Sequence, residues 1–376
     1  VGRFLAAWIL SRPFLKGKPW LFTTVFLLGA FFLTSFSNPY VMILVFWGML
    51  YNVLNLFDIK PYEKYTNIMV GGVVLASTVG MSVFPFKGIA MILLKVYQNI
   101  SGIAVGYAQW IIFIIIMGVS MVLAYVLIAK FIFQPDVSAL KNIGTEIIDP
   151  KDLVLTKQMK WMMFFLVAFI GIVLLQGFLP ADWAITPTLK ALGPVGVAVG
   201  ILTVMLWIKV DDKPLFDFVS IAKHGRMWDM LICCVVVLPM ASMLTSEATG
   251  LQPFLVKILT PIFGNLSPIV FTFTVVLLAI ILTNFLQNFV VGLMFLPIVC
   301  SFTAAMGVSS LPGAVLLIFG VHLALLTPAA SPFAVMLFSN TEWIKAKEMY
   351  KIMGISLIVL TLICAMLGTV LVQIIF

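Results

Sequence analysis

Two short polar segments interrupt long apolar stretches of this chain. The first contains Ser37 and Asn38 and the second contains Gln287 and Asn288, and apolar arms of helical length flank each of them. An asparagine amide both donates and accepts hydrogen bonds, and the N-terminus of a helix that follows such a tip favours an anion. Inside a membrane, a polar tip needs partners in protein or in a water-filled cavity. The two tips therefore predict a transporter whose binding site lies where they meet.

A single tip of this kind would have a simpler explanation, because Asn and Ser also cap ordinary helix ends. Here, however, each tip is followed by an apolar stretch that is itself interrupted. The stretch 66–98 contains VGGVVLASTVGMSVFPFKG, and the stretch 311–339 contains TPAASP. Glycine and proline in such positions predict helices that break inside the membrane. Two matched pairs of hairpin and broken helix favour binding over capping.

Lys87 lies in the first of these interruptions. An ammonium near the middle of a membrane costs at least about 2.5 kcal/mol and marks a candidate functional site. We expect Lys87 to pair with an anionic substrate or to replace a coupling cation; the alternative is that its long side chain reaches an interface. We interpret Asp229 as an interfacial residue at a helix start and His322 as a hydrogen-bonded packing residue.

The composition defines the class of protein. Of 376 residues, 63% are hydrophobic and only 10% are charged, and the apolar runs reach the roughly 20 residues that span a bilayer. The net charge of +8 is carried by short segments between these runs, so we interpret it as an orientation signal and expect no nucleic-acid partner. The chain has no HExxH, GxSxG or phosphate-binding glycine loop, so we expect neither an enzyme nor a cofactor.

The predicted fold is an all-α polytopic membrane protein with inverted repeats, two re-entrant helical hairpins and two discontinuous transmembrane helices. We expect an interfacial amphipathic segment over 1–19, a first repeat over 20–134, a cytoplasmic linker over 135–160 and a second repeat over 161–376. The first repeat is expected to lack its N-terminal part. The predicted elements are hairpin arms at 20–36 and 41–57, a broken helix at 66–98, spans at 108–130, 161–179, 191–208 and 228–245, hairpin arms at 268–286 and 289–306, a broken helix at 311–339, and a last span at 354–376.

The distribution of basic residues supports this topology. If both hairpins are re-entrant, eighteen of the twenty-two Lys and Arg residues share one side of the membrane. The positive-inside rule makes that side cytoplasmic, so the first hairpin enters from the cytoplasm, the second enters from outside, and the C-terminus is outside. We expect an integral protein of a prokaryotic plasma membrane.

The two hairpin segments and the second break also resemble a known family. LTSFSNPYVMILVF, TNFLQNFVVGLMFLPI and LLTPAASPFAVMLFS are similar to the corresponding segments of the divalent anion:sodium symporters of the ion transporter superfamily. The resemblance implies sodium-coupled transport of a di- or tricarboxylate, a homodimer, and movement of a hairpin-bearing unit against a scaffold. The chain departs from the family pattern at four positions. Family members carry Thr where this chain has Pro39 and Phe289, Ser where it has Gln287, and often Ser where it has Leu33.

The resemblance also implies ligand-binding residues. A first sodium ion would use Ser37 and Asn38 with carbonyl groups near Gly80. The residues implied for a second sodium ion are Thr283, Gln287 and Asn288, with carbonyl groups near Ala330. At the tips, the residues implied for the anionic substrate are Ser37, Asn38, Gln287 and Asn288. We add Lys87, because of its position within the membrane, and Ser331 as further candidates for contact with the substrate.

Two alternative functions remain open from the sequence. A cation/proton antiporter of the same superfamily is disfavoured, because that chemistry needs a carboxylate deep within a span and none of the fourteen acidic residues is clearly so placed. A passive channel or a non-transporting membrane protein is the other alternative, and the substitutions at Pro39 and Phe289 keep it open.

Overall fold

The computed structural model describes residues 17–142, 154–178, 185–210, 213–217 and 266–376, together with Gly250, Phe254 and Pro261. The interfacial segment expected at the N-terminus, the span 228–245 and Asp229 lie outside the described residues, apart from positions 17–19. The chain divides into two compact units, one comprising mainly 154–244 and the other comprising 2–105, 109–153 and 245–376. The two units are described separately below.

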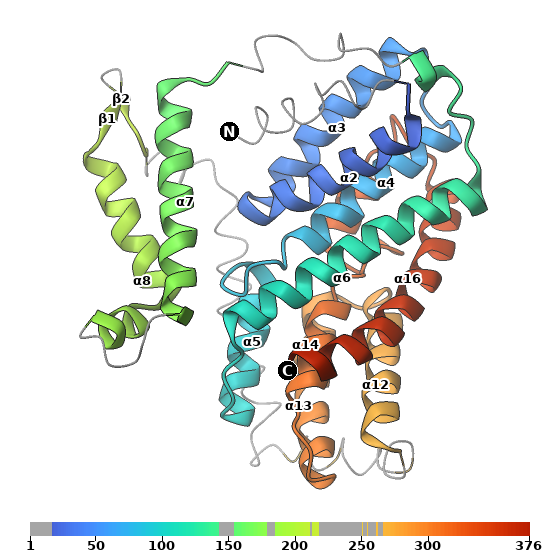
Figure 1. The fold of residues 1–376 in the computed structure, drawn as a ribbon. Helices are drawn as coiled ribbons and strands as arrows, with labels where there is room; N and C mark the ends of the chain where they lie inside the picture. The colour runs from blue at the N-terminus through green and yellow to red at the C-terminus, as the bar shows by residue number, and fades with distance from the viewer. Residues whose placement is uncertain are drawn as a thin grey trace. The chain divides into compact units, whose positions relative to one another are not determined.

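Helices account for nearly all of the described structure in the larger unit, as the sequence predicts (Figure 1). These helices are α2 (Pro19–Phe36), α3 (Pro39–Leu56), α4 (Lys64–Gly80), α5 (Gly88–Ser101), α6 (Tyr107–Ile128) with a π-helical end (Ala129–Phe133), a 3-10 turn (Ala139–Asn142), α12 (Pro268–Thr283), α13 (Asn288–Ala305), α14 (Leu311–Gly320), α15 (Pro332–Phe338) and α16 (Ala346–Ile375). Five of them carry proline at their first or second position, where the missing N–H is not needed.

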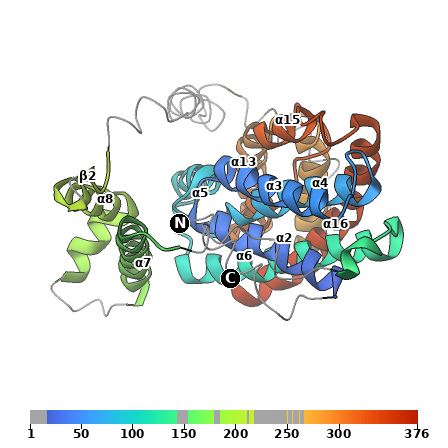
Figure 2. The same cartoon turned by 90° about the horizontal axis from the view of Figure 1, so that it is seen from above.

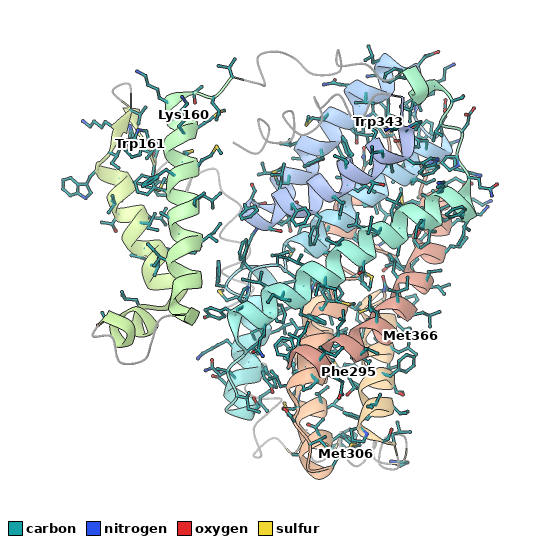
Figure 3. The ribbon with its side chains drawn as sticks, viewed as in Figure 1. Lys160, Trp161, Phe295, Met306, Trp343 and Met366 are labelled. Atoms are coloured by element: carbon teal, nitrogen blue, oxygen red, sulfur yellow. The ribbon has the colours of Figure 1, made fainter. Side chains whose placement is uncertain are left out.

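The smaller unit consists of two helices and a short hairpin. Its elements are α7 (Lys157–Phe178), α8 (Ile185–Trp207), β1 (Lys209–Val210) and β2 (Lys213–Pro214). Phe165, Met205 and Leu215 form its core, and Lys160 and Trp161 lie on α7 near the β-hairpin (Figure 3). The helices match the predicted spans 161–179 and 191–208, but α8 begins earlier and kinks at Gly193, where φ is 58°. Side chains rarely tolerate that conformation, so glycine sets the kink.

Apolar stripes on the surface of the larger unit identify it as a membrane protein. On α16, Ile358, Leu362, Met366, Val370 and Ile374 recur every four residues and are all exposed. One face of the helix is therefore apolar and uncovered, which suits lipid and not water. Five of the described helices are long and apolar enough to cross a membrane, including α6 and α16.

Both arms of the first hairpin meet one end of the larger unit. Near the start of α2, the Thr23 hydroxyl lies 2.9 Å from the Tyr65 hydroxyl at the start of α4. Near the end of α3, the Tyr51 ring stacks on Trp343 with centroids 4.0 Å apart. We call this the Trp343 end; Figure 3 labels the residue. The tip between the arms lies beside the other end of α4.

The second hairpin meets the opposite end, which we call the Met306 end after the labelled residue in Figure 3. A Cβ on Gly313, at the start of α14, would lie 3.1 Å from Val299 and 3.6 Å from Thr272, so both arms flank that start. The Tyr97 hydroxyl, near the end of α5, lies 3.0 Å from Ser310 Oγ. The two hairpins therefore open toward opposite ends of one unit.

Three of the basic segments come together at the Trp343 end, as the charge pattern predicts. Lys64 Nζ donates to the Phe133 carbonyl at 2.9 Å, and the Tyr62 amide donates to the Trp343 carbonyl at 2.9 Å. Segments 58–66, 130–136 and 340–353 therefore share one side of the molecule.

This arrangement predicts which cysteines an impermeant reagent can reach. Single cysteines at Glu342, near the Trp343 end, and at Asn99, near the Met306 end, are to be compared in a background without accessible thiols. We expect a maleimide added to whole cells to label Asn99→Cys and to spare Glu342→Cys. Labelling of Glu342→Cys from outside would show that the assigned orientation is inverted, and labelling of both would contradict the separation of the two ends.

Candidate functional site

The first tip is a tight turn between α2 and α3. Ser37 ends α2 and is half-buried, whereas Asn38 is exposed. Asn38 Oδ1 accepts the Tyr40 amide at 2.9 Å and so caps the N-terminus of α3. This cap uses only the oxygen, so the two Nδ2 donors of Asn38 stay available for an anion.

The break between α4 and α5 packs directly against this tip. Ser35 Oγ lies 3.1 Å from both the Gly80 carbonyl and the Phe31 carbonyl. A Cβ on Gly80 would lie 2.2 Å from the Phe31 carbonyl oxygen. Only glycine permits this approach, so Gly80 determines how closely the end of α4 meets the tip.

Lys87, at the α5 end of this break, also bonds to the first tip. It is the N-cap residue of α5, and its Nζ donates to the Thr34 carbonyl at 2.6 Å, to the Ser35 carbonyl at 3.2 Å and to the Ser37 carbonyl. An ammonium has three N–H donors, and all three find carbonyls at the C-terminal end of α2, where the helix dipole is negative. Lys87 thus occupies a cation position built from backbone oxygens.

In the second half, Asn284 connects the tip to the second break. Its Nδ2 donates to the Ile280 and Leu323 carbonyls, both at 2.9 Å. Its Oδ1 accepts the amides of Leu325 at 3.1 Å and Leu326 at 2.9 Å. The Asn284 carbonyl accepts from the Thr327 hydroxyl at 2.7 Å. The Asn284 side chain thereby provides hydrogen-bond partners for backbone groups at Leu323, Leu325 and Leu326 that the broken helix cannot pair.

Asn288 begins α13 and faces the same break. Its backbone amide donates to the Ala330 carbonyl at 2.9 Å. Its side chain is buried, and Oδ1 has no hydrogen-bond partner. A buried acceptor without a donor is unfavourable by about 1–3 kcal/mol, which indicates a ligand at this position.

The remaining predicted residues of the second half surround this point. Gln287 Oε1 accepts the Val290 amide at 3.2 Å. Ser331 Oγ donates to the Ala324 carbonyl at 2.7 Å and accepts the Ala334 amide at 3.1 Å, so it caps α15. The fully buried Thr283 hydroxyl lies 3.5 Å from the Val321 carbonyl, which is long for a hydrogen bond.

His322 also lies in the second break. It is buried, and its Nδ1 lies 2.8 Å from the Ile318 carbonyl in the last turn of α14, just before the break. This contact agrees with the interpretation of His322 as a hydrogen-bonded packing residue. Its Nε2 is buried without a partner.

Contacts between the halves bring several helix starts together. The Tyr40 ring, at the start of α3, lies 4.9 Å from the Phe333 ring, just after Ser331. A Cβ on Gly292 of α13 would lie 2.6 Å from Leu93 of α5; these two helices lie side by side, as Figures 1 and 2 show. With the bond from Asn288 to Ala330, these contacts link the N-termini of α3, α5 and α13 in one region.

This region suits two kinds of ligand. Helix N-termini present free N–H groups and positive dipole ends, which attract an anion. Unwound backbone carbonyls and an unpaired amide oxygen suit a small hard cation. The described residues contain no group of three or more His, Cys, Asp and Glu that could hold a metal ion, so any cation here would depend on neutral oxygens.

The structure brings predicted site residues together within each half. It pairs Asn288 with Ala330 and the Ser37 carbonyl with Lys87, whereas Asn38 caps its own helix and Gly80 bonds to Ser35. Sequence reasoning missed Asn284 and Ser35. A signal for Asn284 was present, because an asparagine within an apolar arm must find partners when it is buried.

Comparisons with known proteins agree with the fold. A family model described as the sodium:sulfate symporter transmembrane region matches residues 20–376. The YdaH transporter of Alcanivorax borkumensis, whose topology is described as unusual, has a similar fold with a TM-score of 0.60. The identity to that transporter is 14%, and the alignment covers 98% of this chain and 80% of the other. No protein with a curated description matches the chain.

Proposed function

The chain belongs to the sodium:sulfate symporter family, as the resemblance of its hairpin segments predicts, and from this premise we propose that it carries a small anion across the membrane together with sodium. A di- or tricarboxylate is the proposed substrate, and sulfate is the second candidate because the family description names it. Transport, and not catalysis, is the proposed activity.

One observation supports this proposal above the others. The Asn288 side chain is buried beside the break of the second half, and its Oδ1 has no partner. It lies next to the N-termini of α13 and α5, which favour negative charge. A sodium ion on Asn288 Oδ1 and nearby carbonyls would satisfy the free oxygen and add positive charge for the anion.

The remaining site residues receive roles on the same basis. We assign Thr283, Gln287, Asn288 and the Ala330 carbonyl to a cation at the second tip. We assign Asn38 Nδ2 to the anion, because its two donors are free at the start of α3. The Ser331 hydroxyl donates its one proton to the Ala324 carbonyl, so it contacts the anion only if that bond opens.

Lys87 is assigned the place of the cation at the first tip. Its ammonium already takes the carbonyls of Thr34, Ser35 and Ser37, the kind of oxygens that a sodium ion would use. A fixed charge attracts the anion but is not itself transported. We therefore propose that the protein transports fewer sodium ions with each anion than it would if each of the two tips bound a sodium ion.

The mechanism we propose is alternating access by movement of one unit. Both hairpins and both broken helices belong to the larger compact unit, and α7 and α8 belong to the other. This division is what movement of a hairpin-bearing unit against a scaffold requires. We further propose re-entrant hairpins, a homodimer, and a prokaryotic plasma membrane with the C-terminus outside.

Replacing Asn288 tests the proposed cation site. Asn288→Ala removes the free oxygen, and we expect the apparent sodium affinity of uptake to fall at least tenfold, which corresponds to about 1.4 kcal/mol. Asn52→Ala, an exposed asparagine of α3, is the matched control and should behave like the wild type. Unchanged sodium dependence in Asn288→Ala would remove this residue from the site.

Counterflow in proteoliposomes distinguishes the proposed carrier from the alternatives. Vesicles loaded with unlabelled succinate should transiently accumulate labelled succinate, because only a carrier exchanges one for the other. Parallel vesicles loaded with sulfate test the second candidate. Equilibration without accumulation for both anions would favour a channel, and proton release on sodium addition without any anion would favour an antiporter.

A further inference from the structure

A pocket lies at the Trp343 end of the larger unit, where α4 and α16 begin and the π-helical end of α6 stops. A pocket of about 210 Å³ is lined there by Lys64 and Asn67 of α4, Phe133 of α6, and Glu348 and Lys351 of α16. This volume is below the roughly 300–1,000 Å³ of typical small-molecule sites. It suits a compact polar group.

The charged groups of this pocket favour a monoanion. Lys64 Nζ donates to the Phe133 carbonyl at 2.9 Å, which leaves two of its three N–H donors for a ligand. Lys351 is exposed and supplies a second ammonium one turn after Glu348. Two positive charges and one negative charge give the lining a net charge of +1.

The Asn67 side chain favours a ligand that carries a hydrogen-bond donor. It is only 1% exposed, and its Nδ2 donates to the Tyr62 carbonyl at 2.9 Å and to the Glu63 carbonyl at 3.0 Å. These bonds fix the orientation of the amide, so that Oδ1 is the atom left over, and it is buried without a partner. An acceptor of this kind is matched by a ligand hydroxyl or N–H and not by a bare phosphate oxygen.

The surface next to the pocket is apolar. Phe131 and Ile132, at the end of α6, are 62% and 54% exposed, and Ile358 and Leu362 of α16 are 65% and 45% exposed. Acyl chains can lie along such side chains within a membrane.

We propose that this pocket binds the headgroup of an anionic glycerophospholipid that carries hydroxyl donors. Phosphatidylglycerol is the lipid that meets these requirements. The phosphate lies between Lys64 and Lys351, the headgroup hydroxyls donate to Asn67 Oδ1 and Glu348, and the acyl chains follow the exposed residues of α6 and α16. The bound lipid connects the starts of α4 and α16 with the end of α6.

Native mass spectrometry of the detergent-purified full chain tests this site. The probes are phosphatidylglycerol, phosphatidylcholine and soluble glycerol 3-phosphate; phosphatidylcholine has no headgroup donor and no net charge. We expect the wild type to retain one phosphatidylglycerol at least fivefold more than phosphatidylcholine. Lys351→Gln should lose this preference, whereas Lys347→Gln, an exposed lysine on the same helix outside the pocket, should keep it.

Three results would overturn the proposal. Equal retention of the two lipids would exclude headgroup recognition, and an unchanged preference in Lys351→Gln would exclude this pocket. Displacement of the lipid by glycerol 3-phosphate at equal concentration would show a site for a soluble phosphate ester.

Discussion

Lys87→Gln is expected to lower the affinity for the transported anion at least tenfold. The substitution removes a unit positive charge from the first tip and leaves three carbonyls of α2 with at most two donors. At an effective dielectric constant of about 20, two unit charges 4 Å apart interact by about 4 kcal/mol. A tenfold loss, about 1.4 kcal/mol, therefore requires only a fraction of that interaction.

Lys87→Arg separates charge from shape. The guanidinium keeps the charge, but its planar fork fits three converging carbonyls poorly, so we expect partial recovery. Uptake of the labelled anion at varied anion and sodium concentrations gives both affinities. Lys95→Gln, an exposed lysine further along α5, serves as the control. If Lys87→Gln keeps the wild-type anion affinity, the ammonium is a structural cap of α2 and carries no part of the coupling.

Asn284→Ala is expected to cause the largest loss of stability. The substitution leaves the Leu323 carbonyl and the Leu325 and Leu326 amides without partners. Each buried group without a partner costs about 1–3 kcal/mol, so the total is on the order of 3 kcal/mol or more. For a unit of this size, that corresponds to a fall of roughly 5–10 °C in melting temperature.

Thermal unfolding of the purified protein in detergent measures this effect. Thr274→Ala is the matched control, because Thr274 lies on α12, the helix that Asn284 caps, is only half-buried and bonds to the Val270 carbonyl one turn earlier. Its melting temperature should stay within about 1–2 °C of the wild type, because a substitution that leaves no buried group without a partner changes stability by roughly 0.5 kcal/mol. A similar melting temperature for Asn284→Ala would contradict the role of this amide as the link between tip and break.

The order of helices could be predicted from the sequence because each boundary has a local chemical signal. Proline opens α2, α3, α12 and α15, and the glycines and prolines at 80–88 and 327–332 mark both breaks. The opposed hairpins follow from charge, because basic residues gather in the segments that meet at the Trp343 end. These signals act within a few residues and need no knowledge of packing.

The details of the site depend on contacts between distant segments and could not be predicted in this way. Nothing adjacent to Lys87 in the sequence indicates that its ammonium reaches carbonyls about fifty residues earlier, at Thr34 and Ser37. Asn38 and Asn288 look equivalent as tip residues, yet Asn38 is exposed and caps a helix, whereas Asn288 is buried with a free oxygen. Burial decides which asparagine needs a ligand, and burial arises from packing between the halves.

Sodium-driven uptake in proteoliposomes tests the central claim most directly. Purified protein is reconstituted, and labelled succinate and labelled sulfate are offered outside with an inward sodium gradient or with potassium in its place. We expect one of these anions to accumulate above its outside concentration only with the sodium gradient, and the accumulation to collapse when sodium is equalised. Uptake that never exceeds equilibrium for either anion, or that is identical in potassium, would contradict sodium-coupled anion transport.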